Sequence, residues 1–199
     1  MRNTLFLATA AFSLAAAACS KNDDANTADA NVDLNADMNT AMGTNDMGMN
    51  ADANSMTPAT AESFVNTIAG SDKFEIESGK LAETNATSSD LKAFGKTLQT
   101  DHQKSTDMLK AAAAKASPPV TPPTALPADL QAKLDSLKGA KGAAFDAMFL
   151  DQQIAGHQAA LDTLKSYASG GDQQSLKDFA TTAQSVVQMH LDKLNAMKK

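Results

Sequence analysis

Apolar residues recur every three or four positions from about residue 58 to the end of the chain, and no stretch alternates like a strand. This spacing places one apolar side chain above the next on a single face of a helix. Four such stripes predict four long amphipathic helices, and a weaker pattern over 128–137 predicts a short additional one. The pattern therefore predicts an all-α domain over 58–199.

Capping and turn residues mark where these helices begin. Thr57 followed by Pro58 predicts the start of the first helix, because Thr accepts hydrogen bonds at an N-cap and Pro suits the first helical position. Ser88 or Ser89 is expected to cap the second helix. Asp172, which follows a Gly-Gly break, is expected to cap the last one.

The connection between the second and third long helices is rich in proline. Five of the six prolines lie within residues 117–127, which precludes a helix there and predicts an extended segment. Two tight turns and one long connection predict an antiparallel four-helix bundle. We favour an up-down-up-down order, with both tight turns at one end and the proline segment and short helix at the other. The alternative is a crossover in which this connection runs the length of the bundle.

The N-terminus has the pattern of a secretion signal. One Arg precedes an apolar run shorter than the roughly 20 residues that span a membrane, which predicts a signal peptide over 1–18. Three Ala and then Cys19, the one Cys of the chain, resemble a bacterial lipobox. The resemblance implies cleavage before Cys19 and a lipid on its thiol, hence a periplasm-facing envelope lipoprotein anchored to the membrane. Ser20 after the Cys implies the outer membrane; an ordinary cleaved signal with an incidental Cys is the alternative.

Residues 19–57 lack large aliphatic side chains almost completely and show no helical or strand period, which predicts a disordered Asn/Asp/Ala/Met-rich spacer. The net charge of −6 is concentrated here, because the spacer has seven Asp against one Lys while 58–199 has 15 Lys against 16 acidic residues. The acidic balance argues against nucleic acid as a partner, because nucleic acid binding requires a basic face. Spacings such as Met47-x-Met49 are similar to copper-binding methionine motifs, but the sulfurs are few and irregularly spaced, which favours low-complexity drift.

Four polar side chains lie on otherwise apolar stripes: Glu75, His102, His157 and His190. A buried carboxylate or imidazole is costly without a partner, so these groups should face one another, a ligand or a metal. Counting residues from the end with the tight turns predicts that the first three share one level of the bundle and that His190 lies one to two turns deeper. Such a set suits iron, zinc or copper.

Two further interpretations of these positions affect the metal hypothesis. His102 could pair with Glu75 as a structural bridge that needs no metal. The two-metal site of ferritins is not expected, because it requires Glu-x-x-His on two helices. Gln99, Ile154 and Val187 stand at the corresponding positions before the three histidines.

The remaining polar residues give no sign of catalysis. Asp101 and Asp151 lie near the edges of their stripes and are expected to be solvated. At most they would hydrogen-bond a metal-binding side chain without binding the metal themselves. No nucleophile–base pair, phosphate-binding loop or metal-catalysis motif occurs in the sequence. We therefore predict that the protein is not an enzyme.

Between Phe64 and Leu194 the sequence contains a series of short motifs: Glu75-x-x-x-Gly79-Lys80-Leu81-Ala82, Asp101-His102, Phe145-Asp146, His157, Phe179-Ala180 and His190-Leu191. In this order and spacing they resemble the DUF4142 family, a domain of unknown function. The resemblance implies a ferritin-like helical bundle of a kind common in bacterial envelope proteins, and it implies that the four polar positions belong to the family pattern. It implies no biochemical activity, and a shared fold alone does not license iron oxidation.

Two functions remain at this point. The first is an envelope lipoprotein whose bundle has a non-catalytic binding or stress-related role toward an unknown protein or small molecule. The second is a metal-binding protein that holds iron, copper or zinc through Glu75 and the interior histidines. The geometry of these four side chains distinguishes the two.

Overall fold

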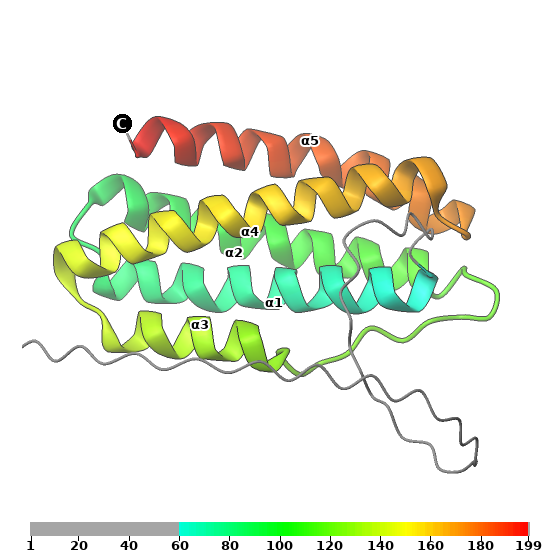
Figure 1. The fold of residues 1–199 in the computed structure, drawn as a ribbon, viewed down its shortest axis with the longest axis horizontal. Helices are drawn as coiled ribbons and strands as arrows, with labels where there is room; N and C mark the ends of the chain where they lie inside the picture. The colour runs from blue at the N-terminus through cyan, green and yellow to red at the C-terminus, as the bar shows by residue number, and fades with distance from the viewer. Residues whose placement is uncertain (1–59, 199) are drawn as a thin grey trace, which may run out of the picture. The chain divides into compact units, whose positions relative to one another are not determined.

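A computed structural model of the chain describes residues 60–198, and within this range it contains five α-helices and no strand. The all-α prediction is therefore confirmed. None of these described helices is both long enough and apolar enough to cross a membrane. The expected signal peptide over 1–18, lipidation site Cys19 and spacer over 19–57 lie outside the described residues. The helices are α1 (Ala61–Asn85), α2 (Ser89–Ala113), α3 (Ala128–Gly139), α4 (Gly142–Gly170) and α5 (Gln174–Met197) (Figure 1).

The helix starts follow the predicted chemistry at one position and depart from it at two. Ser88 caps α2 as expected, with its hydroxyl accepting from the Leu91 N–H. Thr60, not Thr57, is the N-cap of α1, so this helix begins later than predicted. Asp172 does not cap α5, because its carboxylate is occupied by the Tyr167 hydroxyl at 2.6 Å and the Ala61 N–H at 3.3 Å.

The long helices adopt the crossover order, so the favoured up-down-up-down order is wrong. In Figure 1, α1 and α5 run in one direction and α2 and α4 in the other. Asp146, near the start of α4, accepts from the Thr87 N–H at 3.0 Å in the α1–α2 turn. The Ser117 N–H, beyond the end of α2, donates to the Gln173 side chain at 3.0 Å in the α4–α5 turn. The two tight turns therefore lie at opposite ends.

The proline-rich connection makes this crossover. It leaves the end of α2, passes along the outside of the bundle and continues into α3, which packs against α1 (Figure 1). An extended proline segment advances about 3 Å per residue, so it covers distance without needing a helix. Leu134 and Leu137 of α3 are buried in the apolar core, and their packing attaches the connection to the body of the domain.

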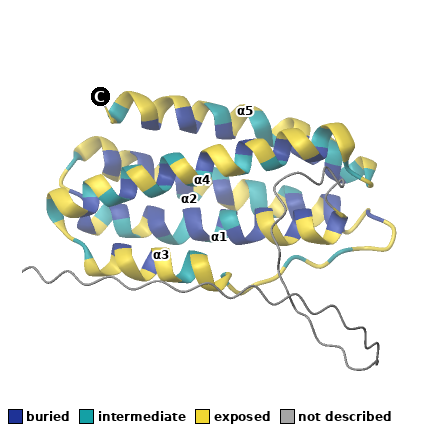
Figure 2. Cartoon of the chain, viewed as in Figure 1, coloured by how far each residue is buried: buried dark blue, intermediate teal, exposed yellow. Residues whose placement is uncertain are grey.

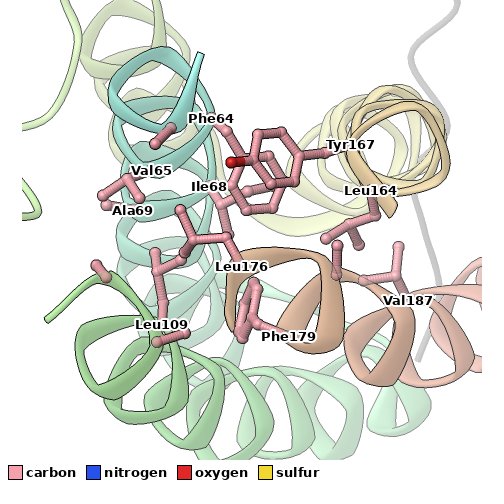
Figure 3. Packing of buried hydrophobic residues seen from close by; sticks show 14 of the residues in the cluster. Phe64, Val65, Ile68, Ala69, Leu109, Leu164, Tyr167, Leu176, Phe179 and Val187 are labelled. Atoms are coloured by element: carbon pink, nitrogen blue, oxygen red, sulfur yellow. The ribbon is translucent and has the colours of Figure 1, made fainter. Parts of the chain in front are cut away.

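Two apolar clusters fill the bundle, one toward each end. The cluster near the α4–α5 turn includes Phe64, whose ring stacks on Tyr167 with centroids 3.9 Å apart (Figure 3). The other, near the α1–α2 turn, is built around Phe94, Phe145 and Phe149. Figure 2 shows the buried stripes facing inward and the exposed positions facing outward. The polar residues singled out in the sequence lie between the two clusters.

Candidate metal centre

Three histidines from three helices converge in the middle of the bundle. His102 comes from α2, His157 from α4 and His190 from α5, and all three are buried. Their ring centroids lie 5.4 to 5.7 Å apart. One ring nitrogen of each lies within 4.8 Å of those of the other two. These are the only histidines of the chain, and the fold brings all of them to one point.

Each imidazole is held from outside through one of its nitrogens. His102 Nδ1 lies 2.8 Å from Asp72 Oδ1, and His190 Nε2 lies 2.9 Å from Asp101 Oδ2. His157 Nδ1 lies 2.9 Å from the Gln153 carbonyl oxygen, one turn earlier on the same helix. Metal-binding histidines use this arrangement widely, because the outer acceptor fixes the ring and directs the other nitrogen to the metal.

The inner nitrogens are the ones left for a ligand. His157 Nε2 and His190 Nδ1 lie 3.3 Å apart, whereas His102 Nε2 is buried without any partner. Metal–nitrogen bonds of 2.0–2.1 Å separate two ligands of a tetrahedral or trigonal ion by about 3.3 to 3.6 Å. The observed separation therefore fits two nitrogens that share one ion, and the third ring contributes a nitrogen within 4.8 Å of both.

Burial and neighbouring charges set the protonation of the rings. Burial, reinforced by nearby His102, lowers the pKa of His157 to about 3. Burial also lowers the pKa of His190, against the opposing effect of Asp101. For His102 burial again opposes the charged form, but the hydrogen bond and charge of Asp72 outweigh it and raise the pKa. Two of the three rings are thus held neutral, which is the form that binds metals.

Glu75 lies beside the three histidines but not among their converging nitrogens. Its Oε1 is 3.9 Å from His157 Nδ1, on the side of that ring already bonded to the Gln153 carbonyl. Its Oε2 is buried and has no hydrogen-bond partner. Burial raises the pKa of this carboxyl to about 7, with His102 acting in the opposite direction. The structure therefore gives Glu75 a position next to the cluster, distinct from that of a fourth inner ligand.

The structure corrects two expectations about this region. His190 was expected one to two turns deeper than the others, but it lies level with His102 and His157. The predicted depth of each residue was measured from the nearest tight turn, which is valid only if both tight turns lie at the same end of the bundle. The crossover puts these two turns at opposite ends. The alternative of a bridge between His102 and Glu75 is also wrong, because His102 pairs with Asp72.

Asp72 is the residue that sequence reasoning missed. It is 3% exposed and contacts both His102 and the Thr106 hydroxyl. It stands four residues after Ile68, a member of the buried stripe of the first helix, so helical periodicity could have identified it. Asp101 holds His190 from outside, whereas Asp151 pairs at the surface with Lys198 at 2.8 Å.

Comparison with known proteins gives a family and a fold. The family described as Domain of unknown function (DUF4142) matches residues 46–197. The chain is also similar to two solved structures, "CopM in the Cu(II)-bound form" and "CopM in the Cu(I)-bound form", with TM-scores of 0.57 and 0.58 and identities of 16% and 17%. Each match covers 70% of this chain and 95% of the other, and at this identity it shows the fold alone. No curated protein matches. Since the family match spans most of the sequence, the chain belongs to the DUF4142 family.

Proposed function

We propose that this bundle binds one metal ion through His102, His157 and His190. The observation that carries the proposal is that each ring has an outer nitrogen fixed by an acceptor and an inner nitrogen directed to a shared point. The preorganised rings reduce the ordering cost of binding. A three-nitrogen site also leaves an ion coordinatively open to a water or another small ligand.

The main competing account is a polar network that needs no metal. Such a network would have to tolerate four buried polar atoms without partners among the described residues, namely His102 Nε2, Glu75 Oε2, Gln152 Oε1 and Gln153 Oε1. Each unsatisfied buried group costs about 1–3 kcal/mol. A metal ion would satisfy the histidine directly, and this difference favours the metal-binding account.

Copper is the metal we propose. Imidazole nitrogen suits copper and zinc, and it tolerates iron and nickel. The two similar solved structures are of copper-bound forms, one with Cu(II) and one with Cu(I). A centre with three nitrogens accommodates Cu(I) in a trigonal arrangement and Cu(II) with added water. Zinc is the nearest competitor, because it also accepts three histidines.

We propose a non-enzymatic role for this centre, namely holding the ion at the cell envelope. A lipid on Cys19 would anchor the protein, and residues 19–57 would separate the bundle from the membrane. The Asp- and Met-rich composition of that segment suits a solvated spacer. The bundle would then sequester or buffer copper without transforming a substrate.

Competition with chelators of known affinity tests the assignment. Purified protein is titrated with Cu(II), anaerobic Cu(I), Zn(II) and Fe(II), and His157→Ala is compared with Gln103→Ala, an exposed neighbour of His102. The expected result is one copper ion per chain, with affinity reduced by at least roughly 100-fold in His157→Ala and unchanged in the control. Circular dichroism shows that the variants are folded. Equal affinities in both variants, or no binding in the wild type, would overturn the proposal.

A further inference from the structure

A groove opens between α1, α3 and α4 and reaches toward the histidine cluster from the side. Its volume is about 420 Å³. Small residues of α4, among them Ala155, Gly156 and Ala159, form one wall, and the first turns of α3 form the rim. Polar side chains of Thr67, Ser71 and Thr163 also line it, and α3 adds one charge of each sign at the rim, Asp129 and Lys133. The groove is thus wide enough for a hydrated ion and is not wholly apolar.

Glu75 lines this groove and also touches the centre. Its side chain is only 2% exposed, its Oε2 has no hydrogen-bond partner, and its Oε1 lies 3.9 Å from His157 Nδ1. Gly156 borders the carboxylate, because a Cβ there would be in van der Waals contact with Glu75 Oε1 at 3.4 Å. The amide oxygen of Gln152, also in the lining, is likewise buried without a partner. Two unsatisfied oxygen acceptors therefore belong to one groove beside the metal centre.

We propose that this groove is the loading site through which a divalent metal ion reaches the histidines, with Glu75 and Gln152 as its oxygen donors. The inference rests on the metal-binding function proposed above. An ion that leaves water loses its hydration shell, and oxygen donors along the route replace part of it. Glu75 then acts as a positioning residue that receives the ion from the groove and releases it to the nitrogen ligands.

A second opening, on the opposite side, is less suited to a cation. It lies between α2 and α5, has a volume of about 110 Å³ and reaches His102. Its lining is mainly apolar, including Met108, Phe179 and Val187, and its two charged residues, Asp101 and Lys104, are of opposite sign. The Asp101 carboxylate is already bonded to His190 at 2.9 Å, and an apolar wall disfavours a hydrated cation. The groove with Glu75 is therefore the preferred route, and the smaller pocket provides a control.

Stopped-flow measurement of Cu(II) transfer from a chromophoric chelator to the protein tests this route. Glu75→Gln keeps the shape of the side chain and removes its charge. We expect it to slow loading by at least tenfold while the equilibrium affinity stays within threefold, so that release slows in parallel. Ala159→Trp, which narrows the groove at an exposed position, should also slow loading. Val186→Trp, which fills the pocket between α2 and α5, should leave the rate unchanged.

Several results would overturn the inference. If Glu75→Gln weakens equilibrium binding by tenfold without slowing loading, Glu75 is a ligand of the bound ion. If Val186→Trp slows loading and Ala159→Trp does not, the ion passes between α2 and α5. If both groove variants load at the wild-type rate, the groove is not the route, although the metal site itself stands. If wild-type protein binds no ion, the proposed function and the loading site fail together.

Discussion

At the scale of single residues, the outer partners of the histidines matter as much as the histidines. Asp72, Asp101 and the Gln153 carbonyl each occupy one ring nitrogen and so decide which nitrogen faces inward. Only Asp72 among them is a fully buried charged group, at 3% exposed. Its removal should therefore disturb the centre most.

The first prediction concerns this outer carboxylate. Asp72→Asn should weaken copper binding by about 10- to 100-fold, because the amide orients His102 less firmly and no longer increases its basicity. Chelator competition measures the effect. Asp107→Asn, which changes an exposed carboxylate on the same helix as His102, is the matched control and should bind like the wild type. Equal affinities in the two variants would show that Asp72 does not support the centre.

The second prediction concerns Glu75 in metal-free protein. Burial raises its pKa from 4.5 to about 7, so the folded state retains a proton that the unfolded state releases between these pH values. The contribution of this carboxyl to the free energy of unfolding is therefore fully present below pH 4.5 and is lost as the pH rises through 7. Glu75→Gln mimics the neutral carboxyl, so its free energy of unfolding relative to the wild type should rise by roughly 2–4 kcal/mol between about pH 4.5 and pH 8.

Urea denaturation of both proteins across this pH range measures the difference. Thr163→Val, a change at another groove residue with no charge, serves as the control and should show no pH-dependent difference from the wild type. A Glu75→Gln difference that stays constant with pH, or that falls as the pH rises, would contradict the assigned burial of the carboxyl.

At the scale of helices, close packing depends on small residues where α1 meets α2. Gly79 and Gly95 face each other there, and a Cβ on Gly95 would lie 2.5 Å from the Gly79 carbonyl oxygen and 2.9 Å from Ala82 Cβ. The backbones of the two helices therefore approach too closely for any side chain. This approach fixes how Asp72 of α1 is placed against His102 of α2.

The third prediction follows from this approach. Gly95→Ala should lower the free energy of unfolding by about 1–3 kcal/mol, because the added methyl group overpacks a rigid helix crossing. Gly139→Ala is the control, since no atom lies within 4 Å of its added Cβ, and it should be neutral or slightly stabilising. Thermal unfolding followed by circular dichroism measures both. Equal melting temperatures for the two variants would refute the close approach.

Periodicity predicted the helices well but did not determine their arrangement. Stripes such as that of α2 predicted the buried face, and His102 lies on it. Thr57 and Thr60 are both good caps, and local sequence alone could not choose between them. The predicted helix order was wrong for a different reason. Turn lengths show which helices are neighbours, but they do not show whether a long connection runs the length of the bundle. Because the predicted depth of His190 depended on the helix order, the wrong order also placed His190 too deep.

At the scale of the whole molecule, a polar layer separates two apolar clusters. Each cluster joins residues from α1, α2, α4 and α5, so the ends of the bundle hold the helices at fixed spacing. The histidines lie between them and are thereby kept rigid. The domain can thus present a preorganised centre even though few of its residues are aromatic.

The fourth prediction concerns the attachment of this domain to the envelope. If Cys19 carries the lipid, Cys19→Ser should move the protein from the membrane fraction to the soluble periplasmic fraction, because diacylated Cys anchors stably and an unmodified spacer does not. Immunoblots of fractionated cells measure the distribution, and mass spectrometry of the wild-type N-terminus provides the control. An unlipidated mature N-terminus in the wild type would refute the anchor.

Electron paramagnetic resonance of the Cu(II)-loaded protein tests the central claim most directly. The chain has three histidines, and all of them lie at this centre, so imidazole nitrogen couplings report on it alone. We predict one Cu(II) per chain, with couplings from three imidazoles that decrease in His102→Ala, His157→Ala and His190→Ala. A spectrum with only oxygen ligands, or one unchanged by all three substitutions, would contradict the metal centre.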